Sequence, residues 1–171
     1  MRLENLIIRL LRTPDIPQIA RAFEEIGWNK PASQYEQYFM EQALKARVVY
    51  VAFLDAEFAG YLTVCWRSSY GPFRERNIPE IVDFNVLPKF RRMGIGTRLM
   101  DTVEDEIARV SPIAGIGVGM TADYGAAQRL YALRGYIPDG LGLYWRDHHI
   151  CYGEEIRVDD DLALYLMKEL K

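Results

Sequence analysis

Residues 91–96 of this 171-residue chain have the composition of a phosphate-binding turn. Gly94 and Gly96 carry no side chain, so their N–H groups can approach an anion closely. Arg91 and Arg92 add guanidinium groups, whose geometry matches phosphate oxygens. The apolar spacing after Gly94 predicts a helix, and the first turn of a helix offers free amides and the positive end of its dipole. Together these features predict a binding site for a diphosphate.

Two better-known glycine loops do not match this turn. The nucleoside-triphosphate loop requires Lys-Ser or Lys-Thr after its last glycine, whereas Thr97 and Arg98 follow Gly96. The dinucleotide fingerprint requires a third small residue, and Leu99 stands at that position. What remains is Arg-x-x-Gly-x-Gly after an expected strand, which resembles motif A of the GNAT superfamily of N-acetyltransferases. The resemblance implies that the turn holds the pyrophosphate of acetyl-CoA.

A second segment, residues 123–138, resembles motif B of the same superfamily, an Ala-x-x-Leu-Tyr helix that ends in a glycine and an aromatic residue. Here Ala127, Leu130 and Tyr131 fall at helical spacing, and Gly135 suits a left-handed helix end. The two motifs stand in the family's order, and the resemblance extends over residues 5–140.

The resemblance also implies which residues contact the cofactor acetyl-CoA. The backbone at the end of the strand before the turn would pair with the pantetheine arm, and Thr97 could add a hydroxyl to the phosphate site. The implied cofactor-binding residues are Asn85, Val86, Leu87, Arg91, Arg92, Gly94, Ile95, Gly96 and Thr97. In one departure from the family, Tyr124 stands where many members have an asparagine that contacts the cofactor, so that contact is not carried over.

Acyl transfer from a thioester to an amine requires a base for the amine and donors for the oxyanion, and an acid assists the departing thiolate. The resemblance places Tyr131 at the CoA sulfur, and a phenol is protonated at neutral pH, so Tyr131 is the expected acid. Glu80 stands where several members have a glutamate base. Asp83 competes for this role, although odd spacing along a strand predicts it on the opposite face from Glu80. Tyr70 and His148 remain alternatives.

The elements that must position these residues follow from periodicity and turn signals. Thr13 as N-cap and the capping box at Ser33 predict the starts of two helices, and a loop is expected at residues 68–79. Gly115, Gly117 and Gly119 fall on one face of a strand, which we interpret as a surface for helix packing. The expected strands are 5–11, 48–54, 58–67, 80–87, 113–120, 136–137, 143–146 and 162–168, and the expected helices are 13–27, 33–46, 94–109 and 124–134.

This order is that of the GNAT fold, an α/β fold with a mixed, mostly antiparallel sheet flanked by about four helices. No repeat or linker divides the chain, so we expect a single domain over residues 1–171.

A net charge of −3 argues against a nucleic-acid partner, and the apolar run at residues 6–11 is too short to cross a membrane. Cys65 and Cys151 are too few for a disulfide framework, which favours the cytoplasm. His148, His149 and Cys151 form one cluster without a partner, so no metal is expected.

The leading hypothesis is transfer of acetyl from acetyl-CoA to a primary amine of a small molecule by direct attack. The alternatives are acetylation of a protein N-terminus or lysine, and a CoA-binding sensor without catalysis. The sequence decides neither the acceptor nor the acyl length, and the resemblance allows a homodimer. Aromatic residues that could form the acceptor pocket are Trp28, Tyr35, Tyr38, Tyr70, Phe73 and Trp145.

Overall fold

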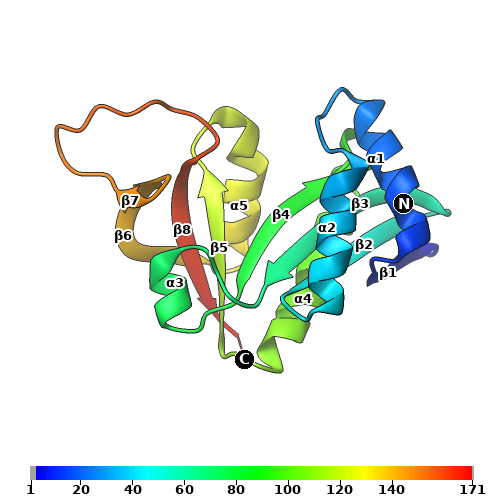
Figure 1. Cartoon of the computed structure of the whole chain (residues 1–171), viewed down its shortest axis with the longest axis horizontal. Helices are drawn as coiled ribbons and strands as arrows, with labels where there is room; N and C mark the ends of the chain where they lie inside the picture. Colours follow the sequence, from blue (N-terminus) through cyan, green and yellow to red (C-terminus); the bar gives the residue numbers. More distant parts are fainter. Residues whose placement is uncertain (1–2, 171) are drawn as a thin grey trace.

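A computed structural model describes residues 3–170 and shows one eight-stranded sheet (Figure 1). The strand order is β1-β2-β3-β4-β5-β8-β6-β7, and every neighbouring pair is antiparallel except β4 and β5. The strands are β1 (Leu6–Leu10), β2 (Arg47–Leu54), β3 (Glu57–Cys65), β4 (Glu80–Val86), β5 (Ile113–Gly119), β6 (Ile137–Trp145), β7 (His148–His149) and β8 (Leu162–Glu169). The expected mixed, mostly antiparallel α/β fold is confirmed.

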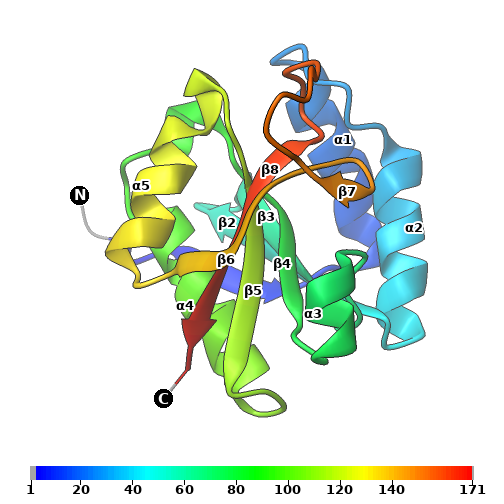
Figure 2. The same cartoon turned by 90° about the vertical axis from the view of Figure 1, so that its left-hand side faces the viewer.

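Helices cover both faces of this sheet (Figure 2). One face carries α1 (Ile16–Glu24), α2 (Ala32–Ala43) and the short α3 (Gly71–Glu75). The other face carries α4 (Ile95–Ala108) and α5 (Gly125–Leu133). We refer to them as the α2 face and the α4 face. Each face has its own apolar core, because alternate side chains of a strand point to opposite sides of the sheet.

The hydrogen bonds at the starts of α1 and α2 differ from those that the sequence predicted. The chain enters α1 through a 3-10 turn at Thr13–Asp15 whose N-cap is Arg12 and not Thr13, and the Asp15 carboxylate accepts the backbone N–H of Arg12 at 2.8 Å. No described side chain caps α2, which starts at Ala32 after Pro31, so the capping box at Ser33 does not form. Gly135 has φ +87° after the end of α5, and its predicted left-handed conformation is confirmed.

The region expected to be a loop contains a helix. Gly71 and Pro72 indicate a turn by composition, yet the chain forms α3 because Phe73 packs its ring over the bare surface at Gly115 on β5. A Cβ atom on Gly115 would lie 2.3 Å from that ring. The described residues therefore form five α-helices rather than about four.

The glycines of β5 are covered by aromatic rings rather than by helix backbone. After Phe73 at Gly115, Tyr165 covers Gly117 and Tyr124 covers Gly119, where an added Cβ would lie 3.1 Å and 2.5 Å from the ring. The expectation of helix packing is therefore correct for Gly115 alone.

The structure also differs from the sequence-based prediction at residues 136–146. The segments expected as two separate strands are one irregular strand, β6, whose register with β8 shifts between Pro138 and Leu143. Within residues 3–170, no helix has the length and apolar character needed to cross a membrane.

Candidate active site

The two parallel strands at the centre of the sheet separate soon after they meet. β4 and β5 pair only at Glu80 with Gly115 and at Ile81 with Ile116, and then diverge (Figure 1). From residue 82 onward, the β4 edge that faces β5 has no strand partner among the described residues. Antiparallel pairing with β3 continues on the other edge as far as Val86. An extended ligand can therefore hydrogen-bond to the backbone groups of residues 82–86 that face β5, as a strand would.

The turn after β4 presents backbone donors at this opening. Gly94 is the N-cap of α4 at φ +87°, a conformation that glycine adopts without strain. No described side chain caps α4, so the first-turn amides, from Ile95 to Thr97, are available to an anion. This is the arrangement that a diphosphate needs, and the residues present fit the pyrophosphate of acetyl-CoA.

The other residues predicted at the turn have distinct positions. Ile95 is buried in the core under α4, so only its backbone can serve a ligand, whereas Arg92 and Thr97 are exposed. Arg91 is also exposed, but its Nε donates to the Val86 carbonyl at 3.1 Å. Packing also favours glycine at position 96, because a Cβ atom added there would lie 3.1 Å from the Phe84 ring.

Both acidic residues of β4 lie on the α2 face, which the sequence did not predict. A register shift in the β3–β4 ladder marks a β-bulge, and Asp83 there has φ +51°. The extra residue reverses the alternation of β4, so Asp83 contacts Tyr61 of the α2-face core. Glu80 pairs with Cys65, two positions beyond Thr63 in β3, and shares this side. The expectation that Asp83 faces away from Glu80 was wrong because regular strand spacing does not hold across a bulge.

Glu80 is a buried carboxyl group that accepts few hydrogen bonds. It is 4% exposed, and its Oε2 accepts the Ser68 hydroxyl at 2.5 Å. No other described residue donates a hydrogen bond to this side chain. Burial raises the pKa of Glu80, and the Ser68 hydrogen bond and the charge of Arg47 only partly oppose this. A carboxylate in this environment gains by accepting a proton, as a general base does.

Asp83 has the opposite environment. Its Oδ2 accepts hydrogen bonds from Tyr61, Tyr38 and Gln34 at 2.5, 2.9 and 2.8 Å. Its Oδ1 accepts hydrogen bonds from Lys30 and Asn85 at 2.7 and 2.8 Å. Five donors exceed the four or so lone-pair sites of a carboxylate, so both oxygens of Asp83 are fully engaged in hydrogen bonds. Glu80 is therefore the better candidate for the base.

The expected acid, Tyr131, lies on the α4 face of the sheet. It is 5% exposed and belongs to the core that contains Val118 of β5. Burial raises the pKa of its phenol, which therefore stays protonated at neutral pH. Glu80 and Tyr131 thus lie on opposite sides of the sheet.

A second polar cluster lies on the α2 face and was not predicted. The Tyr70 hydroxyl lies 2.7 Å from Asp139 Oδ2 and 2.8 Å from His149 Nε2, and its ring stacks on Tyr165 at 3.6 Å. Because Tyr70 and His149 are 79 residues apart, only the fold brings them together. Ser68 links this cluster to Glu80, because its hydroxyl accepts the backbone N–H of Tyr70 at 2.9 Å.

The remaining acceptor candidates divide between core and site. Tyr35 and Phe73 are fully buried core residues, whereas Tyr38 contacts Asp83. Trp28 stacks on Phe23, and the Trp145 indole donates to Asp159. His148 lies instead between Asp147 and Glu154, at 3.0 and 2.5 Å. Residues 3–170 contain no group of three or more His, Cys, Asp or Glu side chains that could hold a metal ion.

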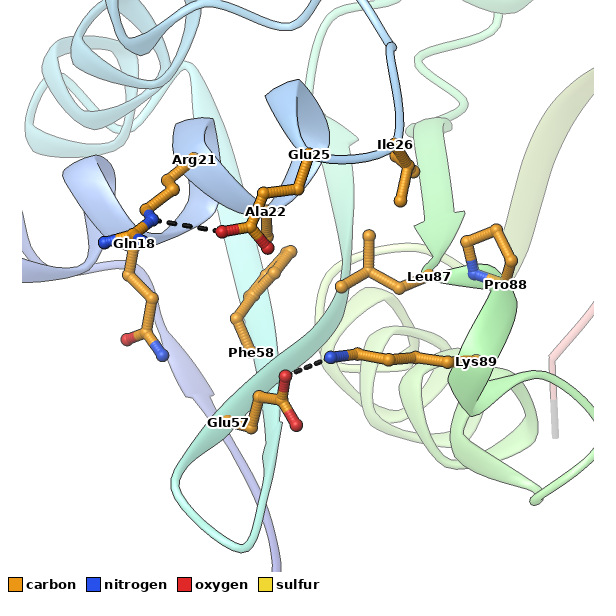
Figure 3. Close-up of a pocket in the computed structure, with 10 residues that line it drawn as sticks. All are labelled: Gln18, Arg21, Ala22, Glu25, Ile26, Glu57, Phe58, Leu87, Pro88 and Lys89. Carbon is orange, nitrogen blue, oxygen red and sulfur yellow. Dashed lines mark hydrogen bonds and ion pairs between the residues drawn. The ribbon is translucent and has the colours of Figure 1, made fainter.

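A cavity of about 530 Å³ lies beside the end of β4, between α1 and the β2–β3 turn (Figure 3). Its lining includes Leu87 and Lys89, and Lys89 forms an ion pair with Glu57 across it. Glu80, Asp83 and Tyr131 are not among its lining residues, so this cavity is separate from the candidate reaction site.

Comparison with known proteins agrees with this geometry. Residues 13–136 match the model of the acetyltransferase (GNAT) family. An N-alpha-acetyltransferase of Sulfolobus acidocaldarius is 36% identical over 104 residues, which are 56% of this chain and 58% of the relative. An N-acetyltransferase of Archaeoglobus fulgidus without a characterised function is 36% identical over 85 residues, 49% of this chain and 56% of the relative. The chain thus spans little more than half the length of these two curated relatives.

Solved structures show the same fold. One from Salmonella typhimurium, described as an acetyltransferase with its cofactor acetyl-CoA, has a TM-score of 0.69 at 17% identity. The match covers 98% of this chain and 95% of that chain.

Proposed function

Because this chain belongs to the GNAT family of acetyltransferases, we propose that it transfers the acetyl group of acetyl-CoA to a primary amine of a small molecule. The observation that carries the proposal is the pair of acidic residues on β4, with buried Glu80 beside the β4–β5 opening and an amine, that of Lys30, bound at Asp83. An acceptor amine can approach the opening from this face.

Each residue has a defined part in this proposal. Acetyl-CoA supplies an activated thioester, so no covalent enzyme intermediate is needed. The α4 N-terminus and Arg92 hold the diphosphate, while the free edge of β4 orients the extended arm. Glu80 accepts the amine proton, and Tyr131 donates a proton to the departing sulfur from the other side of the sheet.

The surroundings of Glu80 support a compact acceptor. The Asp83 network joins the α1–α2 linker, α2 and β3, and the Tyr70 cluster joins β6 and β7 to the segment before α3. Hydrogen bonds thus fix the elements on both sides of Glu80. The free thiols of Cys65 and Cys151 and the net charge of −3 support a cytoplasmic enzyme with a cationic substrate.

The experiment that tests the cofactor site is the melting temperature with and without acetyl-CoA. Ligand at about 100 times its dissociation constant adds roughly 2.7 kcal/mol of stability. For a domain of this size, that raises the melting temperature by roughly 5–10 °C. Arg92→Glu should reduce the shift. Arg109→Glu, the same charge change at the other end of α4, should retain it.

Acceptor amines are then screened by release of CoA, with small amines and peptides in parallel. Turnover of small amines supports the proposal, whereas turnover of peptides alone would indicate a protein acetyltransferase. A shift without any turnover would leave a CoA-binding sensor, and no shift at millimolar acetyl-CoA would contradict the enzyme itself. Size-exclusion chromatography of the same samples tests for a homodimer.

A further inference from the structure

The α2 face already contains a bound primary ammonium, supplied by the chain itself. Lys30 lies in the linker between α1 and α2, and its Nζ is 2.7 Å from Asp83 Oδ1 and 2.9 Å from the Tyr61 hydroxyl. The same nitrogen lies 5.6 Å from the ring centroid of Tyr61 and 5.8 Å from that of Phe23. A carboxylate, a phenol oxygen and two aromatic rings form a complete recognition site for a primary ammonium.

This ammonium site shares the α2 face with Glu80. Asp83 and Glu80 are three residues apart, so their backbones are separated by about 10 Å along the strand. Two side chains and a water molecule can bridge that distance. The bulge is what brings both carboxylates to one side of the sheet, and regular pairing would separate them.

The site does not depend on Lys30 for its shape. Gln34 and Tyr38 donate to Asp83 from α2, Tyr61 donates from β3 and Asn85 from β4. These four donors lie on regular elements and would hold the carboxylate in place without the lysine. Lys30 alone comes from a linker outside any helix or strand.

We propose that Asp83 binds the ammonium group of the acceptor, and that Lys30 is a built-in competitor which the acceptor displaces. The inference rests on the proposed acetyl transfer to a primary amine, and it gives Asp83 and Glu80 different roles. Asp83 binds the charged amine, and Glu80 removes its proton. Lys30 thereby raises the acceptor concentration that is needed to half-fill the site.

Kinetics of Lys30→Met with any amine that the wild type acetylates test the competition. If Lys30 fills the site about nine-tenths of the time, its removal lowers KM for the amine roughly tenfold, with a smaller change in kcat. Lys30→Arg keeps a tethered cation and should stay closer to the wild type. Lys45→Met, the same change at an exposed position after α2, is the matched control. A KM that is unchanged or higher in Lys30→Met would overturn the proposal.

A binding experiment tests the site without relying on turnover. Lys30→Ala is titrated with n-propylammonium and followed by its melting temperature, with tetramethylammonium as a cation that lacks N–H donors. Saturable stabilisation by n-propylammonium, absent in the wild type and in Lys30→Ala/Asp83→Asn, supports the proposal. Its absence in a Lys30→Ala variant that still responds to acetyl-CoA would overturn it. Failure of the proposed function alone would appear instead as no turnover of any amine while this titration still succeeds.

Discussion

At the scale of single residues, environment rather than residue type separates the two carboxylates of β4. Asp83 is surrounded by five donors, whereas Glu80 has one hydroxyl and is otherwise buried. Two carboxyl groups with such different surroundings suit different tasks, one to bind a cation through its hydrogen-bond network, the other to gain and lose a proton.

The raised pKa of Glu80 gives a testable pH dependence. We expect kcat/KM for an acceptor amine to increase with pH as Glu80 ionises, with a midpoint above the ordinary glutamate value of 4.5. Glu80→Gln should remove this increase and lower kcat about 10²- to 10⁴-fold. Tyr131→Phe is the comparison, because it should lower turnover but keep the increase of kcat/KM with pH that Glu80 causes. A pH profile unchanged by Glu80→Gln would assign the base to another group.

The same group makes the folded state sensitive to pH. Because burial raises the folded-state pKa, the folded protein binds the Glu80 proton more tightly than the unfolded chain does. This contribution to stability is present below about pH 4.5 and is lost as pH rises through the folded pKa. The melting temperature of Glu80→Gln should therefore fall less than that of the wild type as pH rises.

At the scale of elements, local chemistry was visible in the sequence, but contacts between distant segments were not. Gly94 was placed correctly at the start of a helix, and Gly135 in the left-handed conformation after the end of another, because the neighbouring sequence marks both helix ends. The bulge at Asp83 follows from donors on three other elements, and no local signal marks it. The helix α3 was missed for a similar reason, since Phe73 is held by a strand about 40 residues away in sequence.

That contact gives a prediction for the element itself. Gly115→Ala places a Cβ 2.3 Å from the Phe73 ring and should lower the free energy of unfolding by about 1–3 kcal/mol, measured by urea denaturation. Gly125→Ala is the control, because nothing lies within 4 Å of its added Cβ. Adding Phe73→Leu to Gly115→Ala should recover part of the loss. Equal stability of the two alanine variants would show that α3 moves freely.

At the scale of the molecule, an ion-pair cluster ties α4, α5 and β8 together. Arg134 donates to both oxygens of Glu104 at 2.9 and 2.8 Å, and Lys168 donates to Glu104 at 2.6 Å. Burial would raise the pKa of Glu104, but the hydrogen bonds from Arg134 and Lys168 outweigh this and lower it. The stability that this carboxylate provides is present above about pH 4.5 and is lost as pH falls through its lowered pKa.

Glu104→Gln should therefore cost up to about 3 kcal/mol at neutral pH, because it removes the carboxylate from Lys168 and leaves Arg134 with Asp101 alone. The difference from the wild type should shrink as pH falls below about 4.5, which melting curves in acid would show. Glu106→Gln on the same helix is the control. Its partner Arg109 is 73% exposed, so the change should cost less than about 1 kcal/mol. A constant difference at every pH would mean that Glu104 contributes by packing alone.

The sheet is nearly divided between β4 and β5. Strands β1–β4 form one continuous ladder, and β5, β8, β6 and β7 form another, but within residues 3–170 only two β4–β5 residue pairs join these ladders. A ligand that adds its hydrogen bonds to the β4 edge supplies part of the missing connection. The connection between the two halves would then depend on the acyl donor, and the amides of residues 82–86 that face β5 should exchange more slowly in the loaded enzyme than in the empty one.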